Sequence, residues 1–181
     1  MMSEADIARG DIVIASAGMI LYRYTKTGNI EVLVGKRSGE PWKGCYLCVF
    51  GGLVQPEDKN VFTAAIREAM EETGGKLCIK PQGIRIGTFG PKSFHHLLSL
   101  NKKNQVQAVK TNTLISIRHS FAMTVYAGLV VSGKPRDTRE VKELCFECPH
   151  VLASKEAPFA FEQALILQKF CKRFVYNYQD A

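Results

Sequence analysis

The stretch REAMEETGG, residues 67–75, places three glutamates within about one helical turn, directly before two glycines. Glu68, Glu71 and Glu72 are spaced i, i+3 and i+4, so on a helix they share one face, where like charges repel by roughly 0.2–0.5 kcal/mol per pair. Glycine favours the position just past a helix C-terminus, and the helix dipole disfavours anions at that end. A bound cation would relieve both penalties, so the stretch predicts a cation-binding face.

The residues around this stretch predict a helix over 61–73. Apolar and small side chains recur there at three- and four-residue spacing, and the glutamates lie off this stripe. Asp58 or Asn60 is suited to cap the start. Hard divalent cations prefer carboxylate oxygens, and Gly51 and Gly52, which have no side chains, let the backbone approach a metal closely.

The rest of the chain predicts strands, one helix, more strands and a final helix. Residues 12–37 form a hairpin pattern, 44–50 a third strand ending at the two glycines, and 157–178 a closing amphipathic helix. Between them, strand patterns cover 77–81, 84–90, 113–131 and 141–147. We expect an α/β sandwich with a mixed β-sheet between helices, formed by one domain over residues 1–181.

Composition favours an anionic ligand. The 181 residues carry a net charge of +7, which suits a nucleotide, a diphosphate or, as a less favoured partner, RNA. The start has acidic residues and no basic segment before an apolar stretch, and residues 12–24 are too short to span a bilayer. We therefore expect a cytoplasmic protein without a membrane partner.

Residues 51–75, GGLVQPEDKNVFTAAIREAMEETGG, resemble the Nudix box of the Nudix hydrolase family. Gly52 matches its first glycine, and Arg67, Glu68, Glu71, Glu72 and Gly74 match its Arg-Glu-x-x-Glu-Glu-x-Gly core. Asp58 stands where the family has Glu, with Glu57 as the alternative, and eight residues rather than seven separate Asp58 from Arg67.

The resemblance implies an α/β/α Nudix fold and a Nudix-type pyrophosphohydrolase that uses Mg²⁺ or Mn²⁺. The implied substrate is a nucleoside diphosphate linked to another group, such as a nucleotide-sugar, an ADP-ribose-like compound or a dinucleotide. Glu68, Glu71 and Glu72 would bind metal together with Gly51, Glu68 would also act as the base, and Arg67 would orient the glutamates, pairing with Glu71 at i+4.

Several assignments stay open at this point. A further base or carboxylate could come from Glu140, Glu143, Glu147, His95 or His96, whereas His119 fits a structural role better. Trp42 and Arg37 are candidates for substrate binding, although Trp42 could equally fill the edge of the core. Residues 91–112, a long polar connection, are expected to influence substrate choice.

Other functions compatible with the sequence are hydrolysis of nucleoside triphosphates or capped RNA, and a Nudix-fold module that binds nucleotide without cleaving it. The extra residue between Asp58 and Arg67 favours the binding module. The presence of all three glutamates on the cation-binding face argues against it. The oligomeric state, including a homodimer, is left open.

Overall fold

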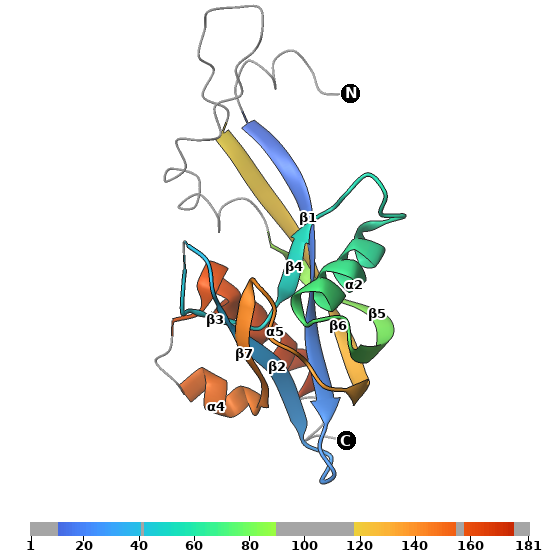
Figure 1. Ribbon diagram of the computed structural model, residues 1–181, viewed down its shortest axis with the longest axis vertical. Helices are drawn as coiled ribbons and strands as arrows, with labels where there is room; N and C mark the ends of the chain where they lie inside the picture. Colours follow the sequence, from blue (N-terminus) through green and yellow to red (C-terminus); the bar gives the residue numbers. More distant parts are fainter. Residues whose placement is uncertain (1–10, 41, 90–117, 155–157, 176–181) are drawn as a thin grey trace, which may run out of the picture.

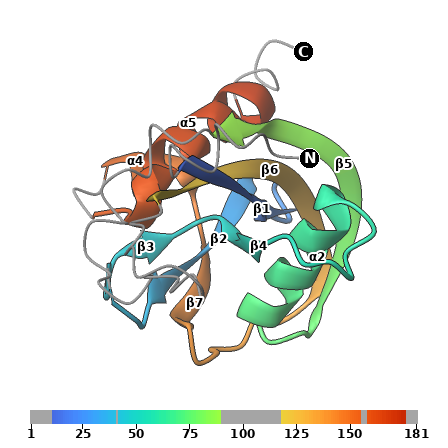
Figure 2. The same cartoon turned by 90° about the horizontal axis from the view of Figure 1, so that it is seen from above.

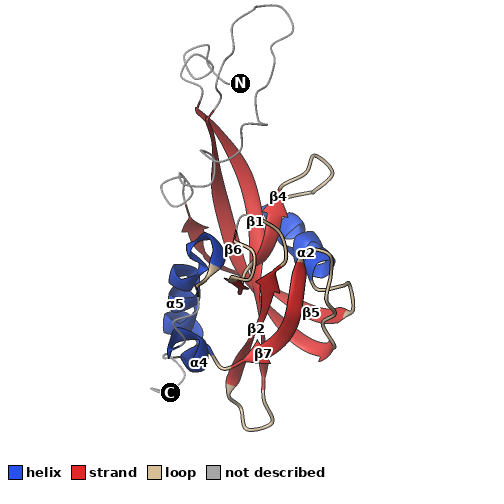
Figure 3. Ribbon diagram, turned by 60° about the vertical axis from the view of Figure 1, so that its left-hand side comes forward, coloured by secondary structure: helices blue, strands red, loops and turns tan. Residues whose placement is uncertain are grey.

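The computed structural model describes residues 11–40, 42–89, 118–154 and 158–175, which form a mixed sheet between two helical layers. Helix α2 (Val61–Glu72) covers one face, and helices α4 (Pro149–Ser154) and α5 (Gln163–Phe174) cover the other (Figure 3). The predicted α/β sandwich is therefore confirmed.

The sheet is built around a long parallel pair. Strands β1 (Asp11–Tyr24) and β6 (Arg118–Gly133) run in parallel from the pair Asp11–Arg118 to Tyr22–Leu129 (Figure 1). Strand β5 (Leu77–Phe89) continues the sheet antiparallel to β6. On the other side of β1 lie β2 (Ile30–Arg37) and β4 (Phe50–Leu53), and β2 also pairs with β3 (Tyr46–Leu47) and β7 (Val141–Glu147).

Alternation along β1 divides the core into two layers, because successive side chains of a strand point to opposite faces. Ala17, Met19 and Leu21 pack toward α2 with Ala64, Ala65 and Ala69. Ile20 and Tyr22 pack on the opposite face with residues of α5 such as Phe170, which is fully buried. Figure 2 shows the two helical layers on opposite sides of the strands.

Three predicted elements differ in detail. The single strand expected over 44–50 is two short strands, because the backbone N–H groups of Cys48 and Val49 bond to the side chain of Gln163 instead of a neighbouring strand. The two strands expected over 77–90 are one strand, whose pairing with β6 shifts between Pro81 and Ile84.

The closing helix also begins later than expected. Residues Ala160–Glu162 form a short 3-10 helix, η2, and α5 starts at Gln163. Helix α4 was not predicted from the sequence, because six residues give too short a stretch for a periodic pattern. The predicted connection 91–112, with His95 and His96, lies outside the described residues.

Candidate functional site

Local signals position helix α2 at both ends. Asn60 is the N-cap: its side-chain oxygen accepts a bond from the Thr63 N–H at 2.9 Å, and its own N–H donates to Thr63 Oγ1 at 3.1 Å. Gly74 and Gly75 follow the helix with φ of +79° and +69°, a backbone conformation that glycine adopts easily and other residues adopt rarely. Of the two predicted capping residues, Asn60 is therefore the cap, and Asp58 has another partner.

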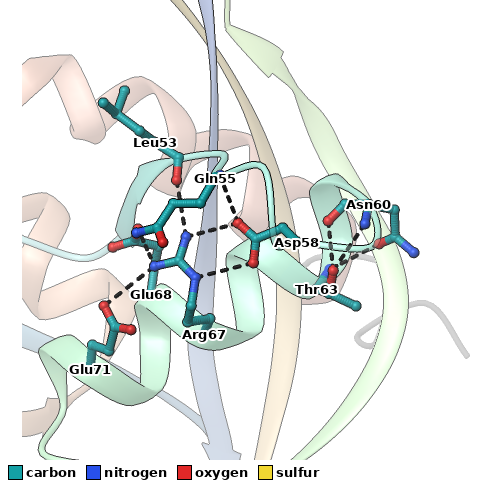
Figure 4. Close-up of polar contacts among 8 residues, drawn as sticks. All are labelled: Leu53, Gln55, Asp58, Asn60, Thr63, Arg67, Glu68 and Glu71. Carbon is teal, nitrogen blue, oxygen red and sulfur yellow. Dashed lines mark hydrogen bonds and ion pairs between the residues drawn. The ribbon is translucent and has the colours of Figure 1, made fainter.

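That partner is Arg67, which links the loop after β4 to helix α2 (Figure 4). The Arg67 guanidinium donates to Asp58 Oδ1 at 3.1 Å and Oδ2 at 2.9 Å, and to the Leu53 carbonyl at 3.0 Å. Asp58 Oδ2 also accepts the N–H of Gln55. The extra residue before the helix does not prevent this contact, so Asp58 and not Glu57 takes the position opposite Arg67.

The same guanidinium contacts two of the three glutamates. Arg67 donates to Glu68 Oε1 at 2.7 Å and to Glu71 Oε2 at 3.4 Å, the latter at the predicted i+4 spacing. The Glu68 side chain is 14% exposed and that of Glu71 is 59% exposed. The glutamates of the predicted cation-binding face are thus unequally exposed: Glu68 faces the protein, and Glu71 lies at the solvent edge.

Glu72 lies deepest and faces the two glycines. Its Oε2 accepts the N–H of Gly51 at 2.7 Å. At Gly52, a Cβ atom would lie 2.5 Å from Glu68 Oε2, so a larger residue there would displace that carboxylate. The structure therefore places Glu68 beside Gly52 and Glu72 beside Gly51.

Burial raises the pKa of Glu72 to about 8. The negative charges of Glu140 and Glu68 act in the same direction, whereas the Gly51 N–H and Arg37 lower it. Desolvation and two neighbouring carboxylates thus favour the neutral form of Glu72 in the free protein, and a bound cation would favour the ionised form. A divalent cation is the group that such hard oxygen donors fit.

The three glutamates that could supply a carboxylate from outside the helix have different surroundings. Glu140 precedes β7 and lies close enough to affect the ionisation of Glu72. Glu143 instead pairs with Lys36 at 2.6 Å, and Glu147 Oε1 lies 3.9 Å from the sulfur of Cys145. His119 lies in β6. Glu140 is therefore the candidate that the fold brings toward the acidic face.

The carboxylates are not yet arranged around one point. Within the described parts of the chain, no three His, Cys, Asp or Glu side chains converge closely enough to hold an ion as they stand. In this arrangement Glu68 and Glu71 are both bonded to the Arg67 guanidinium. Metal binding by Glu68, Glu71, Glu72 and Gly51 remains a prediction.

A pocket of about 180 Å³ adjoins Glu72. Its walls include Gly51, Gly52 and Arg37, and also two residues that sequence reasoning missed, Phe161 and Gln163. No local pattern indicates Phe161, which lies inside a predicted helix yet has φ of +53°. A larger cavity of about 490 Å³ lies elsewhere, against the β1–β2 turn and α4, with Asn29 and His150 in its wall.

Both predicted substrate-binding residues meet at Phe161. The Arg37 guanidinium lies 5.0 Å from the centre of the Phe161 ring, and the ring of Trp42 lies 6.2 Å from it. Trp42 is 38% exposed, so it is not a core residue. Arg37 thus lies at the pocket that Glu72 lines, and Trp42 lies beside the pocket through Phe161.

Comparisons with known proteins agree with this arrangement. The NUDIX domain family model matches residues 14–170. Among solved structures, the chain is similar to the NUDIX domain of Shewanella oneidensis NrtR in complex with ADP ribose, with a TM-score of 0.61 and 15% identity over 96% of this chain and 100% of that one.

Two further structures have the same fold. An Ap4A hydrolase of C. elegans gives a TM-score of 0.58 at 20% identity, over 91% of this chain and 98% of that one. A MutT/nudix family protein of Enterococcus faecalis gives a TM-score of 0.63 at 16% identity, over 97% of this chain and 70% of that one. A search of curated proteins gave no significant match.

No helix in the described parts of the chain is long and apolar enough to cross a membrane. The family match spans most of the chain, including both halves of the site, the acidic helix and the pocket wall. The chain therefore belongs to the Nudix family, the class of pyrophosphohydrolases that its sequence predicted.

Proposed function

We propose that the protein is a Mg²⁺-dependent hydrolase that cleaves the diphosphate linkage of a nucleoside diphosphate joined to another group. The observation that carries the proposal is the partly buried Glu72 carboxylate, which accepts the Gly51 N–H, lies near the charges of Glu68 and Glu140, and lines a pocket with Gly51 and Gly52. The ADP ribose and Ap4A in the names of the similar structures are compounds of this class.

In this proposal Glu68 and Glu72 would hold the cation, Glu71 would join them from the solvent edge, and Glu140 would add a carboxylate from outside the helix. When bound, Mg²⁺ or Mn²⁺ supplies charge neutralisation at the phosphate oxygens and acidifies water. Glu68 takes a proton from the attacking water while a new P–O bond forms. The P–O bond of the anhydride breaks, and its oxygen leaves with the departing phosphate.

Arg67 acts in this scheme as a positioning residue. Its bonds to Asp58 and the Leu53 carbonyl hold the guanidinium against the loop, so the charge stays next to Glu68 and Glu71. These contacts are the geometric basis for assigning Arg67 and Asp58 to orientation and not to metal binding. A cytoplasmic location stays a prediction of the sequence, and the oligomeric state stays open.

The decisive experiment measures phosphate and nucleotide release with Mg²⁺ over a panel of nucleotide-sugars, ADP-ribose, dinucleotides, nucleoside triphosphates and capped RNA. We expect cleavage of at least one diphosphate-linked compound, and a loss of about 100-fold or more in Glu68→Gln, the lower range for removing a general base. Glu140→Gln should also lower the rate, whereas Glu143→Gln, whose carboxylate is held by Lys36, should not.

Melting curves establish that each variant is folded. Binding without cleavage of any compound would identify the alternative function, a nucleotide-binding Nudix module. Full activity of a folded Glu68→Gln variant would contradict the proposed mechanism. Equal losses in Glu140→Gln and Glu143→Gln would contradict the assignment of Glu140.

A further inference from the structure

Two aromatic residues beside the pocket have unusual backbones. Among the described residues, three that are not glycine have positive φ, and two of these are Trp42, at +76°, and Phe161, at +53°. This conformation is uncommon for any residue with a side chain and rarest for bulky ones. Strained backbones of this kind concentrate at ligand sites, where the surrounding structure maintains them.

The surroundings of Phe161 explain how its conformation is maintained. Ala160 before it is fully buried, and Gln163 shortly after it is anchored in the core by bonds to Cys48 and Val49. The chain between these fixed points has to turn sharply, which brings the ring of Phe161 to the pocket wall. The ring is partly buried and also packs against the core layer on the α2 side of the sheet.

Two polar side chains of the pocket are bonded to the backbone of the surrounding core. Gln163 Oε1 accepts two backbone N–H groups, and Ser16 Oγ donates to the Ala122 carbonyl at 3.3 Å. Arg37 and Glu72 lie in the same wall. Arg37 is suited to phosphate oxygens because its guanidinium carries several donors and a permanent charge.

These residues form a row. Glu72 and Arg37 line one pocket, the Arg37 guanidinium lies over the Phe161 ring, and Phe161 contacts Trp42, whose indole is partly exposed. The pocket volume of about 180 Å³ is below the roughly 300–1,000 Å³ of sites that enclose a whole ligand. A pocket of this size has room for only one part of a nucleotide, so the rest would have to lie outside it, where Trp42 is exposed.

We propose that Trp42, supported by Phe161, is the site that stacks on the planar base of the substrate, with Arg37 binding the phosphate between this site and the acidic face. The ring centres of Trp42 and Phe161 are 6.2 Å apart and tilted by 51°, so no base fits between them. The base stacks on the exposed face of the indole, and Phe161 sets the position of that indole. The inference deepens the proposed function, on which it rests for the choice of a nucleotide.

The test uses Trp42 as its own reporter, because it is the single tryptophan of the chain. Tryptophan fluorescence is titrated with ADP, with pyrophosphate and with ribose 5-phosphate. We expect ADP to quench the emission in a saturable manner and the two compounds without a base to leave it unchanged. Quenching by pyrophosphate equal to that by ADP would overturn the stacking assignment.

Variants separate stacking from folding. Phe161→Leu should weaken ADP binding by about threefold or more, within the range for losing one aromatic pair, and Phe161→Tyr, which keeps the ring, should restore it. Phe146→Leu is the matched control, because Arg23 lies over that ring at 4.1 Å and the residue lies outside the pocket wall. Equal weakening in Phe146→Leu and Phe161→Leu would overturn the role of Phe161.

Activity provides a second readout. Trp42→Leu should raise KM for a nucleotide substrate by about fivefold or more, the lower range for one stacked base, with little change in kcat. Cleavage of nucleotides by a protein whose Trp42 emission does not respond to ADP would refute the site and leave the proposed function standing. Saturable quenching without cleavage of any compound would refute the hydrolase and leave the site standing.

Discussion

Glu72 has an environment that few glutamates have. It is the most deeply placed of the three, it accepts one backbone N–H from Gly51, and it has the charges of Glu68 and Glu140 nearby. Burial without a full set of partners disfavours the charged form, which is why its pKa is raised to about 8. In the proposed function, a bound cation would relieve the cost that these features place on the ionised side chain.

A Glu72→Gln variant tests the cost of ionising this side chain in the folded protein. The folded pKa lies above the ordinary value of 4.5, so the unfolded chain ionises first and the parent loses stability as pH rises from about 4.5 to about 8. In metal-free buffer the variant lacks this loss, and its melting temperature should exceed that of the parent by more at pH 9 than at pH 5.

Magnesium should act on the melting temperatures in the opposite direction, in favour of the parent. A ligand stabilises the state that binds it, so added Mg²⁺ should raise the melting temperature of the parent more than that of Glu72→Gln. Glu31→Gln serves as the control, because that carboxylate is paired with Arg23 away from the acidic face. If the difference in melting temperature between Glu72→Gln and the parent were the same at pH 5 and pH 9, Glu72 would not be the group that causes the loss of stability with rising pH.

At the scale of elements, the loop after β4 and helix α2 behave as one unit. Asp58 accepts two bonds from Arg67 and one from the Gln55 N–H, and only 7% of its side chain is exposed. The hydrogen bonds from Arg67 are the main reason that the pKa of Asp58 is lowered, with a further contribution from Gln55. The loop is therefore fastened to the same guanidinium that contacts the glutamates.

Replacing Asp58 with Asn should change the response to acid. Because the pKa is lowered in the folded state, the stability from Asp58 is present above its ordinary value of 3.8 and is lost as pH falls through the lowered value. The parent should thus lose melting temperature more steeply than Asp58→Asn below about pH 4, and the variant should be less stable at neutral pH. Glu57→Gln, an exposed neighbour, should follow the parent; if it followed Asp58→Asn instead, the assignment of Asp58 would be wrong.

At the scale of the whole molecule, Gln163 joins the two layers of the fold. It begins α5 on one face of the sheet, and its amide holds the backbone of Cys48 and Val49 where β3 ends and β4 begins. Strand β4 then leads directly to Gly51 and Gly52. The position of the glycines against Glu68 and Glu72 thus depends on a residue more than a hundred positions later in the chain.

Gln163→Leu should therefore be destabilising far beyond an ordinary surface change. It leaves two buried N–H groups and one carbonyl without this partner, and each such loss costs about 1–3 kcal/mol. We expect the free energy of unfolding in urea to fall by at least about 2 kcal/mol. Gln168→Leu, on the exposed side of the same helix, should stay within about 0.5 kcal/mol of the parent; equal effects of the two changes would contradict the role of Gln163.

What the sequence determined by itself is local. The helix over 61–72, its apolar stripe, its acidic residues and its terminal glycines follow from periodicity and capping, which involve neighbours within a few positions. The i+4 contact between Arg67 and Glu71 follows for the same reason. The hairpin from β1 to β2 and the strand over 141–147 were predictable because alternation and turn residues are also local signals.

Tertiary structure decided the rest, because these features depend on contacts between distant segments. Burial of Glu72, the approach of Glu140 and the break between β3 and β4 arise where chain segments far apart meet. The left-handed backbone of Phe161 opposes its local preference and is maintained by anchors on either side. A sequence shows which residues can ionise, stack or turn, but burial and proximity, which set their energies, exist only once the layers have packed.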